Sequence, residues 1–459
     1  MSNFIGRDAQ LKLLEAAWHG EGGMLTLIYG RRRIGKTELI RHFVHNKSTV
    51  FFTGKETKPQ ILIDDLLSQA KLCFGYEIAK EGEVTSWKAA IRLIIAGWRK
   101  DERLILVFDE LQWAAAASPE LIGTLQELWD HEWKDNQKVG IILCTSFVAY
   151  ALKLVGSQSP LFARTTLNIS LQPFLPAEAK QFHPHYKDTD LAQIYFICGG
   201  VPLYHMAFAT DLPFRHNLTH SLLSPAGALY REGETLLRAE FQDMPSYFAI
   251  LTALAEKPRR NKDILELMDV KDAHYYLERL MRVGYIHRIL PIANRVPRTE
   301  VRYAIHDAFL RWWFFFLFKN LSAVELLGPE ESFSRIIAPQ LDRFFAQCFE
   351  DFCRGWLQRH YITHEGTTGE VIVGQYWRHE TVQIDVVGKR TKDRWIDIGE
   401  CKWGKVKSLP AVMEELERKA ADYPLPKDFS VGRRLFLHHS PEKPHGLKIK
   451  IHTLEEMLK

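Results

Sequence analysis

Apolar residues follow three different patterns along the 459-residue chain. Continuous apolar runs within Leu25–Phe43, Arg103–Leu111 and Val139–Phe147 predict buried strands of a parallel sheet. From Glu240 onward, apolar residues recur at three- and four-residue spacing, which predicts short helices. Beyond these, a helix with one apolar face precedes a strand and a hairpin. Together the patterns predict an α/β chain with several domains.

The loop after the first run has the pattern Gly-x-x-x-x-Gly-Lys-Ser/Thr. Glycines let backbone N–H groups surround phosphates, and the helix that follows adds the positive end of its dipole. Lys36 is expected to reach the β- and γ-phosphates, and the Thr37 hydroxyl is expected to coordinate Mg²⁺. The segment therefore predicts an ATP site. Its predicted nucleotide-binding residues are Gly30, Arg31, Arg32, Arg33, Ile34, Gly35, Lys36, Thr37 and Glu38.

Polar residues end the other two runs. Asp109 and Glu110 end one run, and Thr145 and Ser146 end the other. Asp109 is expected to bind the water shell of Mg²⁺, and Glu110 to polarise the attacking water, which predicts a hydrolase rather than a passive binder. Thr145 is a candidate sensor of the γ-phosphate, although an ordinary strand end would show the same residue types.

Two further segments add to the similarity between this sequence and a known family. A short segment with Arg7 precedes an amphipathic helix and is expected to cover the adenine, and "CGGVPLYH" (Cys198–His205) follows the third run. With the phosphate loop, these segments resemble the archaeal-type P-loop ATPases of the AAA+/STAND branch. The resemblance implies that Arg164 in "PLFARTT" senses the γ-phosphate or acts as an arginine finger, in cis or in trans. Ala163 stands where the family has glycine.

The middle of the chain predicts a winged helix, with three short helices and a two-stranded wing. Two interpretations compete. In the first, the third helix, which carries Arg279 and Arg282, would read the major groove of DNA while the wing contacts phosphates. Alternatively, the module packs against the nucleotide domain and reports its state, as in STAND-like ATPases. The wing is expected to turn near residues 294–297, and its arginines are Arg288, Arg295, Arg298 and Arg302.

The segment Thr381–Trp403 predicts a β-hairpin that turns at residues 392–393. Pairing outward from this turn places Asp385 opposite Glu400. Glu400 and Lys402 share a face, because residues two apart in a strand point the same way. Adjacent carboxylates bind Mg²⁺ or Mn²⁺ well, and such a metal with a nearby lysine activates water and stabilises the charge on a phosphodiester.

An Asp and a Glu-x-Lys on a hairpin, preceded by a helix with Glu350, look like the PD-(D/E)XK nuclease fold. The resemblance implies that Glu350, Asp385 and Glu400 bind the metal and that Asp385, Glu400 and Lys402 are catalytic. Gln383 stands where the family often has glutamate. An inactive, DNA-binding shell of this fold, or a solvated basic face, would show the same pattern. The basic residues nearby are Lys389, Arg390, Lys392, Arg394, Lys405 and Lys407.

The predicted fold class is α/β and multidomain, with a P-loop NTPase parallel sheet, a helical lid, a winged helix and a restriction-endonuclease-like α/β domain. "YAIHDAFLRWWFFFLF" resembles the aromatic segment that follows the winged helix in the same family, and predicts a core helix. The predicted parts are the ATPase core (1–170), helical lid (171–238), winged helix (239–306), aromatic connecting helix (307–335) and nuclease-like domain (336–459).

Composition adds little but excludes some classes. The chain is 46% hydrophobic and 25% charged, as ordinary packed proteins are, and its net charge of +4 permits a nucleic-acid partner without requiring one. The N-terminus lacks the layout of a signal peptide, and the most apolar stretch, Phe309–Phe318, is too short to cross a bilayer. We therefore expect a cytoplasmic protein without a membrane partner.

The residues together predict an ATP-hydrolysing switch coupled to a metal-dependent, DNA-cleaving domain, with ATP and Mg²⁺ at the first site and Mg²⁺ or Mn²⁺ at the second. Two alternatives stay open. One is an ATP-dependent DNA-binding regulator, and the other is a STAND-type signalling scaffold, each with an inactive nuclease fold. Self-association or a partner protein is compatible with all three.

Overall fold

The computed structural model describes residues 4–268, 272–293, 296, 298–367, 369–378, 382–440 and 449–459. The chain divides into two compact units. The first extends to Pro173 and includes Val201–Leu203, and the second contains Phe174–Gly200 and Tyr204–Lys459. The first boundary lies close to the predicted end of the ATPase core, and the finer predicted divisions all fall in the second unit.

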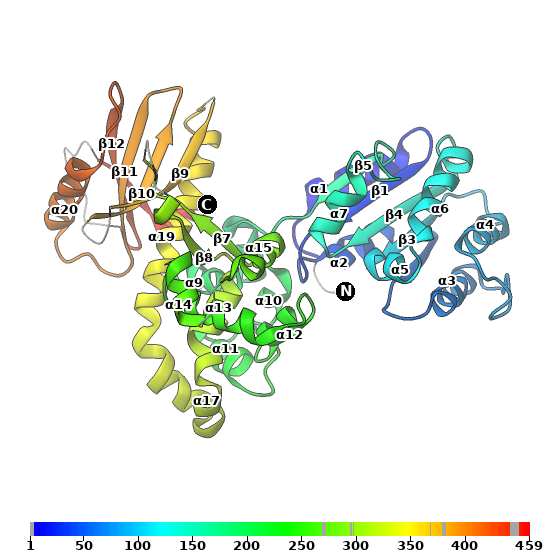
Figure 1. Cartoon of the computed structure of the whole chain (residues 1–459), viewed down its shortest axis with the longest axis horizontal. Helices are drawn as coiled ribbons and strands as arrows, with labels where there is room; N and C mark the ends of the chain where they lie inside the picture. Colours follow the sequence, from blue (N-terminus) through cyan, green and yellow to red (C-terminus); the bar gives the residue numbers. More distant parts are fainter. Residues whose placement is uncertain are drawn as a thin grey trace. The chain divides into compact units, whose positions relative to one another are not determined.

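A five-stranded parallel sheet is the centre of the first unit, with strand order β2-β3-β4-β1-β5 (Figure 1). The strands are β1 (Met24–Tyr29), β2 (Thr49–Thr53), β3 (Leu104–Asp109), β4 (Val139–Thr145) and β5 (Leu167–Ser170). The helices are α1 (Asp8–His19), α2 (Lys36–Val44), α3 (Pro59–Phe74), α4 (Trp87–Gly97), α5 (Leu111–Ala117), α6 (Glu120–Leu128) and α7 (Val148–Val155).

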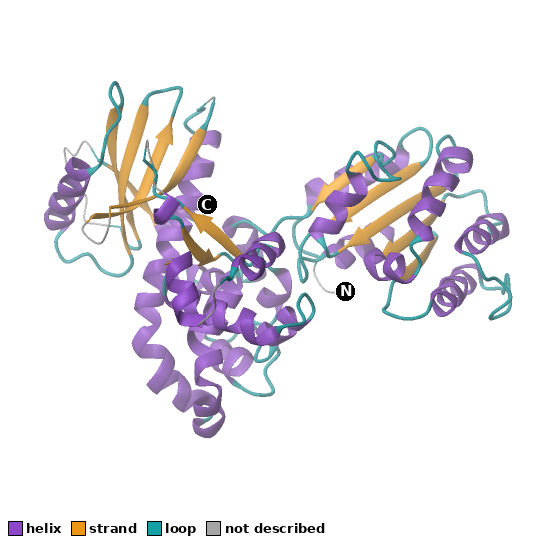
Figure 2. Ribbon diagram, in the orientation of Figure 1, coloured by secondary structure: helices purple, strands orange, loops and turns teal. Residues whose placement is uncertain are grey.

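Helices cover both faces of this sheet (Figure 2). Leu25 and Leu27 of β1 belong to one apolar core, while Met24 and Ile28 belong to the other. Because both faces are buried, these strands are apolar at nearly every position, which explains the continuous runs in the sequence. The strand order places β1 beside β4 and β4 beside β3, so that the carboxyl ends of these three strands lie together.

The second unit begins with a helical region. Its helices are α8 (Pro176–Ala179), α9 (Asp188–Cys198), α11 (Phe214–Leu218), α12 (Glu232–Arg238), α13 (Met244–Glu256), α14 (Asn261–Met268), α15 (His274–Val283), α16 (Ala308–Trp312), α17 (Leu321–Leu327) and α18 (Pro329–Ser332). Helix α10 (Pro202–Met206) has its first two residues in the first unit and the rest in the second. A π-helical turn, Trp313–Leu317, continues α16, and all of its side chains are buried. The aromatic segment is therefore a core helix, as predicted.

Helices α13, α14 and α15 pack with a three-stranded antiparallel sheet of order β6-β8-β7. Its strands are β6 (Arg259–Arg260), β7 (Ile286–Ile289) and β8 (Arg302–Ile305). Of the predicted turn, Asn294, Arg295 and Pro297 lie outside the described residues, as does the side chain of Arg298.

The segment between β7 and β8 contacts the C-terminal sheet. The backbone N–H of Ile292 donates to the carbonyl of Gln375 (2.9 Å), and the indole N–H of Trp377 donates to Glu300 (2.8 Å). The guanidinium of Arg302 lies 4.4 Å from the centre of the Trp377 ring. Arg302 thus packs on a side chain of the neighbouring sheet, a contact that strand periodicity alone does not predict.

The C-terminal sheet is mixed, with strand order β13-β12-β11-β10-β9. Strands β9, β10 and β11 are antiparallel, and β11, β12 and β13 are parallel. The strands are β9 (Val371–Arg378), β10 (Val382–Arg390), β11 (Trp395–Lys402), β12 (Ser430–Leu437) and β13 (Lys450–Thr453), and the helices are α19 (Ala338–Thr363), α20 (Leu409–Asp422) and α21 (Leu454–Met457).

The two long helices cover opposite faces of this sheet. Leu416 of α20 packs with Ile396 and Ile398, whereas Tyr361 of α19 bonds Asp397, which lies between those two residues in β11. The pairing of β10 with β11 follows the predicted register, with Val386 opposite Gly399 and the turn at residues 391–394. In the part of the chain that the structure describes, no helix is both long enough and apolar enough to cross a bilayer.

Candidate functional site

The phosphate loop lies between the carboxyl end of β1 and the start of α2. Its first glycine, Gly30, has φ 158° and is packed closely, because a Cβ there would lie 2.5 Å from the carbonyl oxygen of Leu171. Gly35 precedes α2 with φ 89°, a conformation that residues with a side chain rarely adopt. Both glycines are therefore required by the backbone, and α2 directs its amino end toward the loop.

Lys36 and Arg7 hold the loop. The buried ammonium of Lys36 donates to the carbonyl oxygens of Gly30 (2.9 Å) and Arg31 (3.0 Å). Burial lowers the pKa of Lys36, and the charges of Asp109 and Glu110 oppose this effect. Arg7 is also buried and donates to the carbonyl of Ile34 at 3.3 Å. The structure thus brings the predicted Arg7 segment to the loop.

The predicted magnesium ligands converge. The Thr37 hydroxyl donates to Oδ2 of Asp109 at 2.8 Å, although 72 residues separate them in the chain. Oδ1 of the same carboxylate accepts the N–H of Glu110 at 3.0 Å. A hydroxyl and a carboxylate oxygen beside a phosphate loop form an oxygen donor set that suits Mg²⁺. The residues present therefore fit a Mg²⁺–nucleotide complex.

Glu110 is held by side chains from two other positions. Ser146 donates to its Oε1 at 2.7 Å, and Gln112 donates to its Oε2. The Thr145 hydroxyl in turn donates to the side-chain amide oxygen Oε1 of Gln112 at 2.6 Å. The predicted sensor residue at the end of β4 is therefore linked to the predicted catalytic carboxylate.

Gln112 was not among the residues predicted from the sequence. It is buried, with 5% of its surface exposed, and it connects Glu110 to Thr145. In the sequence, Gln112 is distinguished only as the single polar residue in the otherwise apolar segment after Glu110. Because polar groups are seldom buried without partners, this position could have been marked as a contact of the site.

The other predicted loop residues differ in their surroundings. Ile34 is buried, whereas Arg33 is exposed. The guanidinium of Arg32 lies 5.5 Å from the centre of the Phe147 ring. Glu38 is exposed in the first turn of α2 and lies 3.5 Å from Arg41. Glu38 thus lies on the solvent side of the helix.

The second predicted site lies in the C-terminal sheet. Asp385 and Glu400 are 7% and 2% exposed. Their strands pair in the predicted register, and the N–H of Cys401 donates to Oδ2 of Asp385 at 3.0 Å. Lys402 lies 2.8 Å from Oε1 of Glu400. The structure therefore brings together the two acids and the lysine that the hairpin pattern predicts.

Helix α19 supplies Glu350 and a neighbouring arginine. Arg354 lies 3.7 Å from the Glu350 carboxylate and donates to the backbone carbonyl of Asp385 at 2.6 Å. Burial, reinforced by the charge of Asp385, raises the pKa of Glu350 to about 8. Burial, reinforced by the charge of Glu400, raises the pKa of Asp385 to about 6. Asp385 is thus repelled by Glu400 and itself repels Glu350 in a buried setting.

A divalent cation would relieve this repulsion, and carboxylates are the ligands that Mg²⁺ and Mn²⁺ prefer. The chemistry of the donor set therefore fits such a metal. Within the described ranges, however, no three His, Cys, Asp or Glu side chains are already arranged to hold a metal ion. The predicted metal role of Glu350, Asp385 and Glu400 stays a prediction.

Replacing Glu350 is expected to change the pH dependence of stability. An acid whose pKa is raised on folding stabilises the fold below its unfolded value, and this stabilisation is lost as pH rises through the folded value. Without metal, wild-type stability should therefore fall toward pH 8. Glu350→Gln should be more stable than wild type by about 1 kcal/mol at that pH and similar near about pH 5.

The measurement is the urea midpoint in EDTA at both pH values, with Asp342→Asn as the control because it removes an exposed acid of the same helix. If the midpoint of Glu350→Gln equals that of wild type at both pH values, folding does not raise the pKa of Glu350 and the prediction is contradicted.

Comparison with known proteins agrees with the geometry of the first site. Residues 4–207 match a family described as an ATPase domain found predominantly in Archaea. This segment is similar to that family, and the phosphate loop that it contains agrees with the description. Residues 313–415 match a second family, described as archaeal and bacterial proteins of unknown function.

Relatives of this ATPase-containing chain include two proteins of Methanocaldococcus jannaschii. An uncharacterized protein is 26% identical over 423 residues, which cover 91% of this chain and 92% of the relative. An uncharacterized ATP-binding protein is 46% identical over 44 residues, which cover 10% of this chain and 75% of the relative. A Walker-type ATPase of Pyrococcus abyssi has a similar fold, with a TM-score of 0.51 and 20% identity over 68% of this chain and 96% of that one.

Arg164 of the ATPase domain does not lie at the phosphate loop of its own chain. It forms two 2.8 Å contacts with the carboxylate of Asp130. Thr166, two residues later, bonds Leu25 at the start of β1, whereas the phosphate loop follows the end of that strand. The geometry therefore does not support a γ-phosphate-sensing role in cis, and a role in trans stays a prediction.

The glycines of "CGGVPLYH" have a structural reason. A Cβ at Gly200 would lie 2.0 Å from the carbonyl oxygen of Phe174, so the backbone segments can approach only without a side chain. His205 Nε2 lies 2.7 Å from the carbonyl of Gly199, and its Nδ1 lies 3.0 Å from Nε2 of His183. Burial lowers the pKa of both histidines, to about 3 and about 4 respectively.

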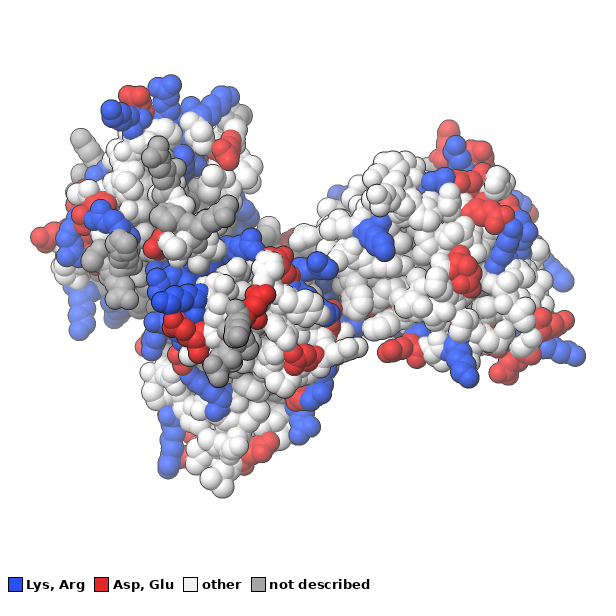
Figure 3. All heavy atoms as spheres, viewed as in Figure 1, with Lys and Arg blue, Asp and Glu red and all other residues white. Residues whose placement is uncertain are grey.

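The basic residues that were predicted around the C-terminal site fall into two groups. Lys389, Arg390, Lys392 and Arg394 lie at the turn of the β10–β11 hairpin, and Figure 3 shows Lys and Arg side chains at that end of the sheet. This end is about 20 Å from the level of Glu400, because six residues of strand separate them. Lys405 and Lys407 instead follow the end of β11, beside the site, and are exposed.

Proposed function

We propose that this protein is an ATP-hydrolysing switch coupled to a metal-dependent nuclease domain that acts on DNA. The observation that carries the second half is the placement of Asp385 and Glu400 on the paired strands β10 and β11, next to Lys402 and inside an apolar sheet. Buried charges of this kind are costly unless they are paired or bind a metal. Metal-dependent DNA cleavage that disappears in Glu400→Gln is the experiment that tests this function.

The ATPase half follows from the arrangement at the phosphate loop. Mg²⁺ bound by Thr37 and Asp109 would neutralise phosphate charge, and Lys36 would stabilise the charge that develops on the γ-phosphate. Glu110, oriented by Ser146 and Gln112, would accept a hydrogen bond from the attacking water. A carboxylate fixed in this position supports ATP hydrolysis rather than permanent ATP binding.

In the C-terminal domain, Asp385, Glu400 and Glu350 are the groups that would hold a divalent cation. When bound, the cation would lower the pKa of a water molecule and stabilise negative charge on a phosphodiester. Arg354 ties α19 to the backbone of Asp385 and so fixes the distance between the helix and the hairpin. Lys402, partly exposed beside Glu400, would stabilise the pentacovalent phosphate by its positive charge.

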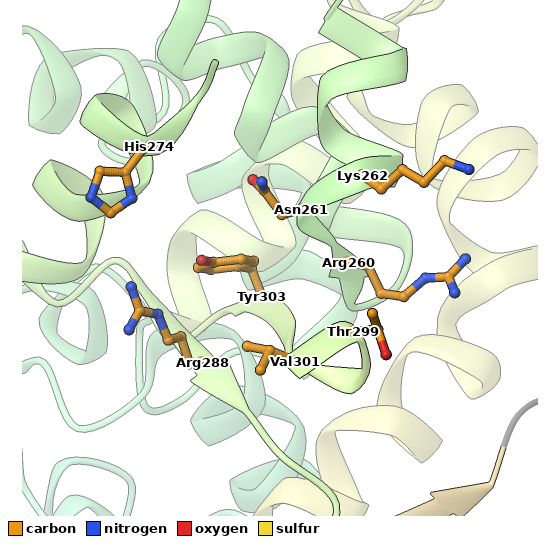
Figure 4. A pocket seen from close by; sticks show the side chains of 8 residues that line it. All are labelled: Arg260, Asn261, Lys262, His274, Arg288, Thr299, Val301 and Tyr303. Carbon is orange, nitrogen blue, oxygen red and sulfur yellow. The ribbon is translucent and has the colours of Figure 1, made fainter. Parts of the chain in front are cut away.

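A DNA partner is supported by a cavity in the segment that was predicted to be a winged helix (239–306). The cavity, about 480 Å³, lies between α14, the start of α15 and the strands β7 and β8 (Figure 4). It is lined by Arg260, Asn261, Lys262, His274, Arg288, Thr299, Val301 and Tyr303, a set without any acid. Such a lining suits the phosphate backbone of a nucleic acid. This supports a winged helix that contacts DNA.

Loss of two cations from this cavity should weaken DNA binding. The double variant Arg260→Ala/Lys262→Ala is expected to reduce affinity about tenfold and to lower the salt dependence by about two phosphate contacts. Fluorescence anisotropy with labelled duplex at several salt concentrations measures both quantities. Lys257→Ala is the control, because Lys257 is exposed in the same module and does not line the cavity. Equal affinities of the double variant and the control would remove the cavity from the DNA interface.

The contact of the β7–β8 segment with the C-terminal sheet supports coupling. Ile292 bonds β9 through its N–H and bonds Tyr423 through its carbonyl (2.9 Å). The helical module and the nuclease-like domain therefore share a packed contact within the second unit. ATP would act through it only if it binds two arrangements of the domains with different affinity.

A second candidate is an ATP-dependent regulator or STAND-type scaffold that grips DNA without cutting it. The observation that favours it is the engagement of Glu400 by lysines, which leaves the carboxylate neutralised without a metal. DNA binding without nicking under any metal condition would select the regulator. Loss of DNA binding together with retained ATP-dependent self-association would select the scaffold.

A further inference from the structure

Helix α20 brings a second lysine to the C-terminal site. Nζ of Lys419 lies 2.6 Å from Oε2 of Glu400, while Nζ of Lys402 lies 2.8 Å from Oε1. The Glu400 side chain is 2% exposed. Each oxygen of a buried carboxylate is thus matched by its own ammonium group. Because an unpaired buried charge is costly, these two lysines are the counter-ions of Glu400.

The same two lysines have an outer partner. Glu415, one turn before Lys419 on α20, lies 3.1 Å from Lys402 and 3.3 Å from Lys419. The Glu415 side chain is 35% exposed, so it lies at the edge of the site. The four side chains form a closed ring in which two ammonium groups are shared between an inner and an outer carboxylate. Either lysine can leave Glu400 and still keep an anionic partner.

Lys419 serves both buried acids of the proposed metal site, because it contacts Glu400 and its charge opposes the rise in the pKa of Asp385. Lys419 is only 17% exposed, and burying a long cationic side chain costs free energy. The arrangement therefore points to a role for Lys419 at Glu400 beyond holding α20 in place, which the apolar contacts of Val412 and Leu416 already do.

We propose that Lys419, with Glu415 as its alternative partner, regulates the occupation of Glu400 by a divalent cation. The inference rests on the proposed function in that Asp385 and Glu400 are taken as metal ligands. Lys419 neutralises Glu400 in the metal-free state. When Glu400 ligates a cation, Lys419 moves to Glu415 and stays beside the site, where its charge assists phosphodiester cleavage. Lys419 is thus a competitor for the metal and a positioning cation for cleavage.

Two readouts with opposite signs test this role. In the full chain without nucleotide, Mn²⁺ binding is measured by isothermal titration, and the part that Glu400→Gln removes is assigned to the C-terminal site. Lys419→Met is expected to tighten this binding about tenfold, because a competing cation is gone, and to slow Mn²⁺-dependent DNA cleavage about tenfold. Lys419→Arg, which keeps the charge, should restore the cleavage rate toward that of wild type.

The matched control is Arg418→Met, which removes a positive charge from an exposed position of the same helix. Mn²⁺ affinity that is equal in Lys419→Met and Arg418→Met would overturn the inference, with circular dichroism showing that both variants are folded. If Lys419→Met tightens Mn²⁺ binding but the wild type cuts no DNA, the counter-ion role stands and the nuclease function fails. If Glu400→Gln leaves Mn²⁺ binding unchanged, the metal site and the inference both fail.

Discussion

Glu110→Gln is expected to bind ATP with nearly wild-type affinity and to hydrolyse it about 100-fold more slowly or worse. Glu110 lies beside the predicted magnesium ligands Thr37 and Asp109, and Ser146 and Gln112 fix its two oxygens. Glutamine fills the same space and keeps some of these hydrogen bonds, but its amide lacks the charge that polarises water. The loss should therefore fall on turnover rather than on binding.

Nucleotide affinity is measured by titration with a fluorescent ATP analogue, and hydrolysis by release of inorganic phosphate. Glu120→Gln is the matched control, because Glu120 is an exposed glutamate at the start of α6. If Glu110→Gln keeps more than about a tenth of the wild-type rate, Glu110 is not the group that activates water.

The second large effect is expected at the C-terminal hairpin. Asp385→Asn and Glu400→Gln should each lower metal-dependent DNA cleavage by about 100-fold or more, because each removes a negative charge from a proposed, buried metal site. Glu400→Gln also leaves Lys402 and Lys419 without their inner counter-ion, so a loss of thermal stability is expected as well. Asp385→Asn should be less destabilising, since its Oδ2 accepts a neutral backbone N–H.

Cleavage is followed by the conversion of supercoiled plasmid to nicked and linear forms in Mn²⁺ or Mg²⁺. Glu414→Gln serves as the control, because it neutralises an exposed glutamate on α20 near the same site. Cleavage that survives in both Asp385→Asn and Glu400→Gln would show that the nicking comes from another site or from a contaminant.

Local features of the two sites could be predicted from the sequence. The strand, loop and helix at Gly30–Thr37 follow from apolar periodicity and from backbone positions that require glycine. The pairing of β10 with β11 was predictable, because a short turn fixes the register of a hairpin. The apolar run that ends at Asp109 indicated a strand buried on both faces.

Contacts between distant segments could not be predicted in the same way. Gln112 joins two strands at the nucleotide site, and Lys419 reaches Glu400 from a helix that periodicity places only approximately. The ion pair between Arg164 and Asp130 joins the turn after α6 to the segment before β5, which lie 34 residues apart in the chain. Each of these contacts is set by packing between elements, about which hydrophobic periodicity carries no information.

The interpretation of the predicted wing changed for the same reason. The arginines of the hairpin left phosphate contact and packing within the protein as alternatives, and in the structure Arg302 packs on Trp377 and Arg288 pairs with Glu278 at 2.6 Å. The C-terminal sheet and α15 therefore already engage these two residues. A DNA contact now depends on the other two cations of the cavity, Arg260 and Lys262, which are exposed and lie 3.2 Å from Asp263 and 3.6 Å from Glu266.

The most direct test of an ATPase coupled to a nuclease is cleavage of plasmid and branched DNA by the full chain, in Mn²⁺ or Mg²⁺, with and without ATP, beside Lys36→Ala. We expect nicking that EDTA abolishes and that ATP changes in the wild type but not in Lys36→Ala. If no DNA is cut under any condition while ATP is still hydrolysed, the nuclease half of the proposal is contradicted. The C-terminal sheet would then belong to an ATPase that binds its partner without cutting it.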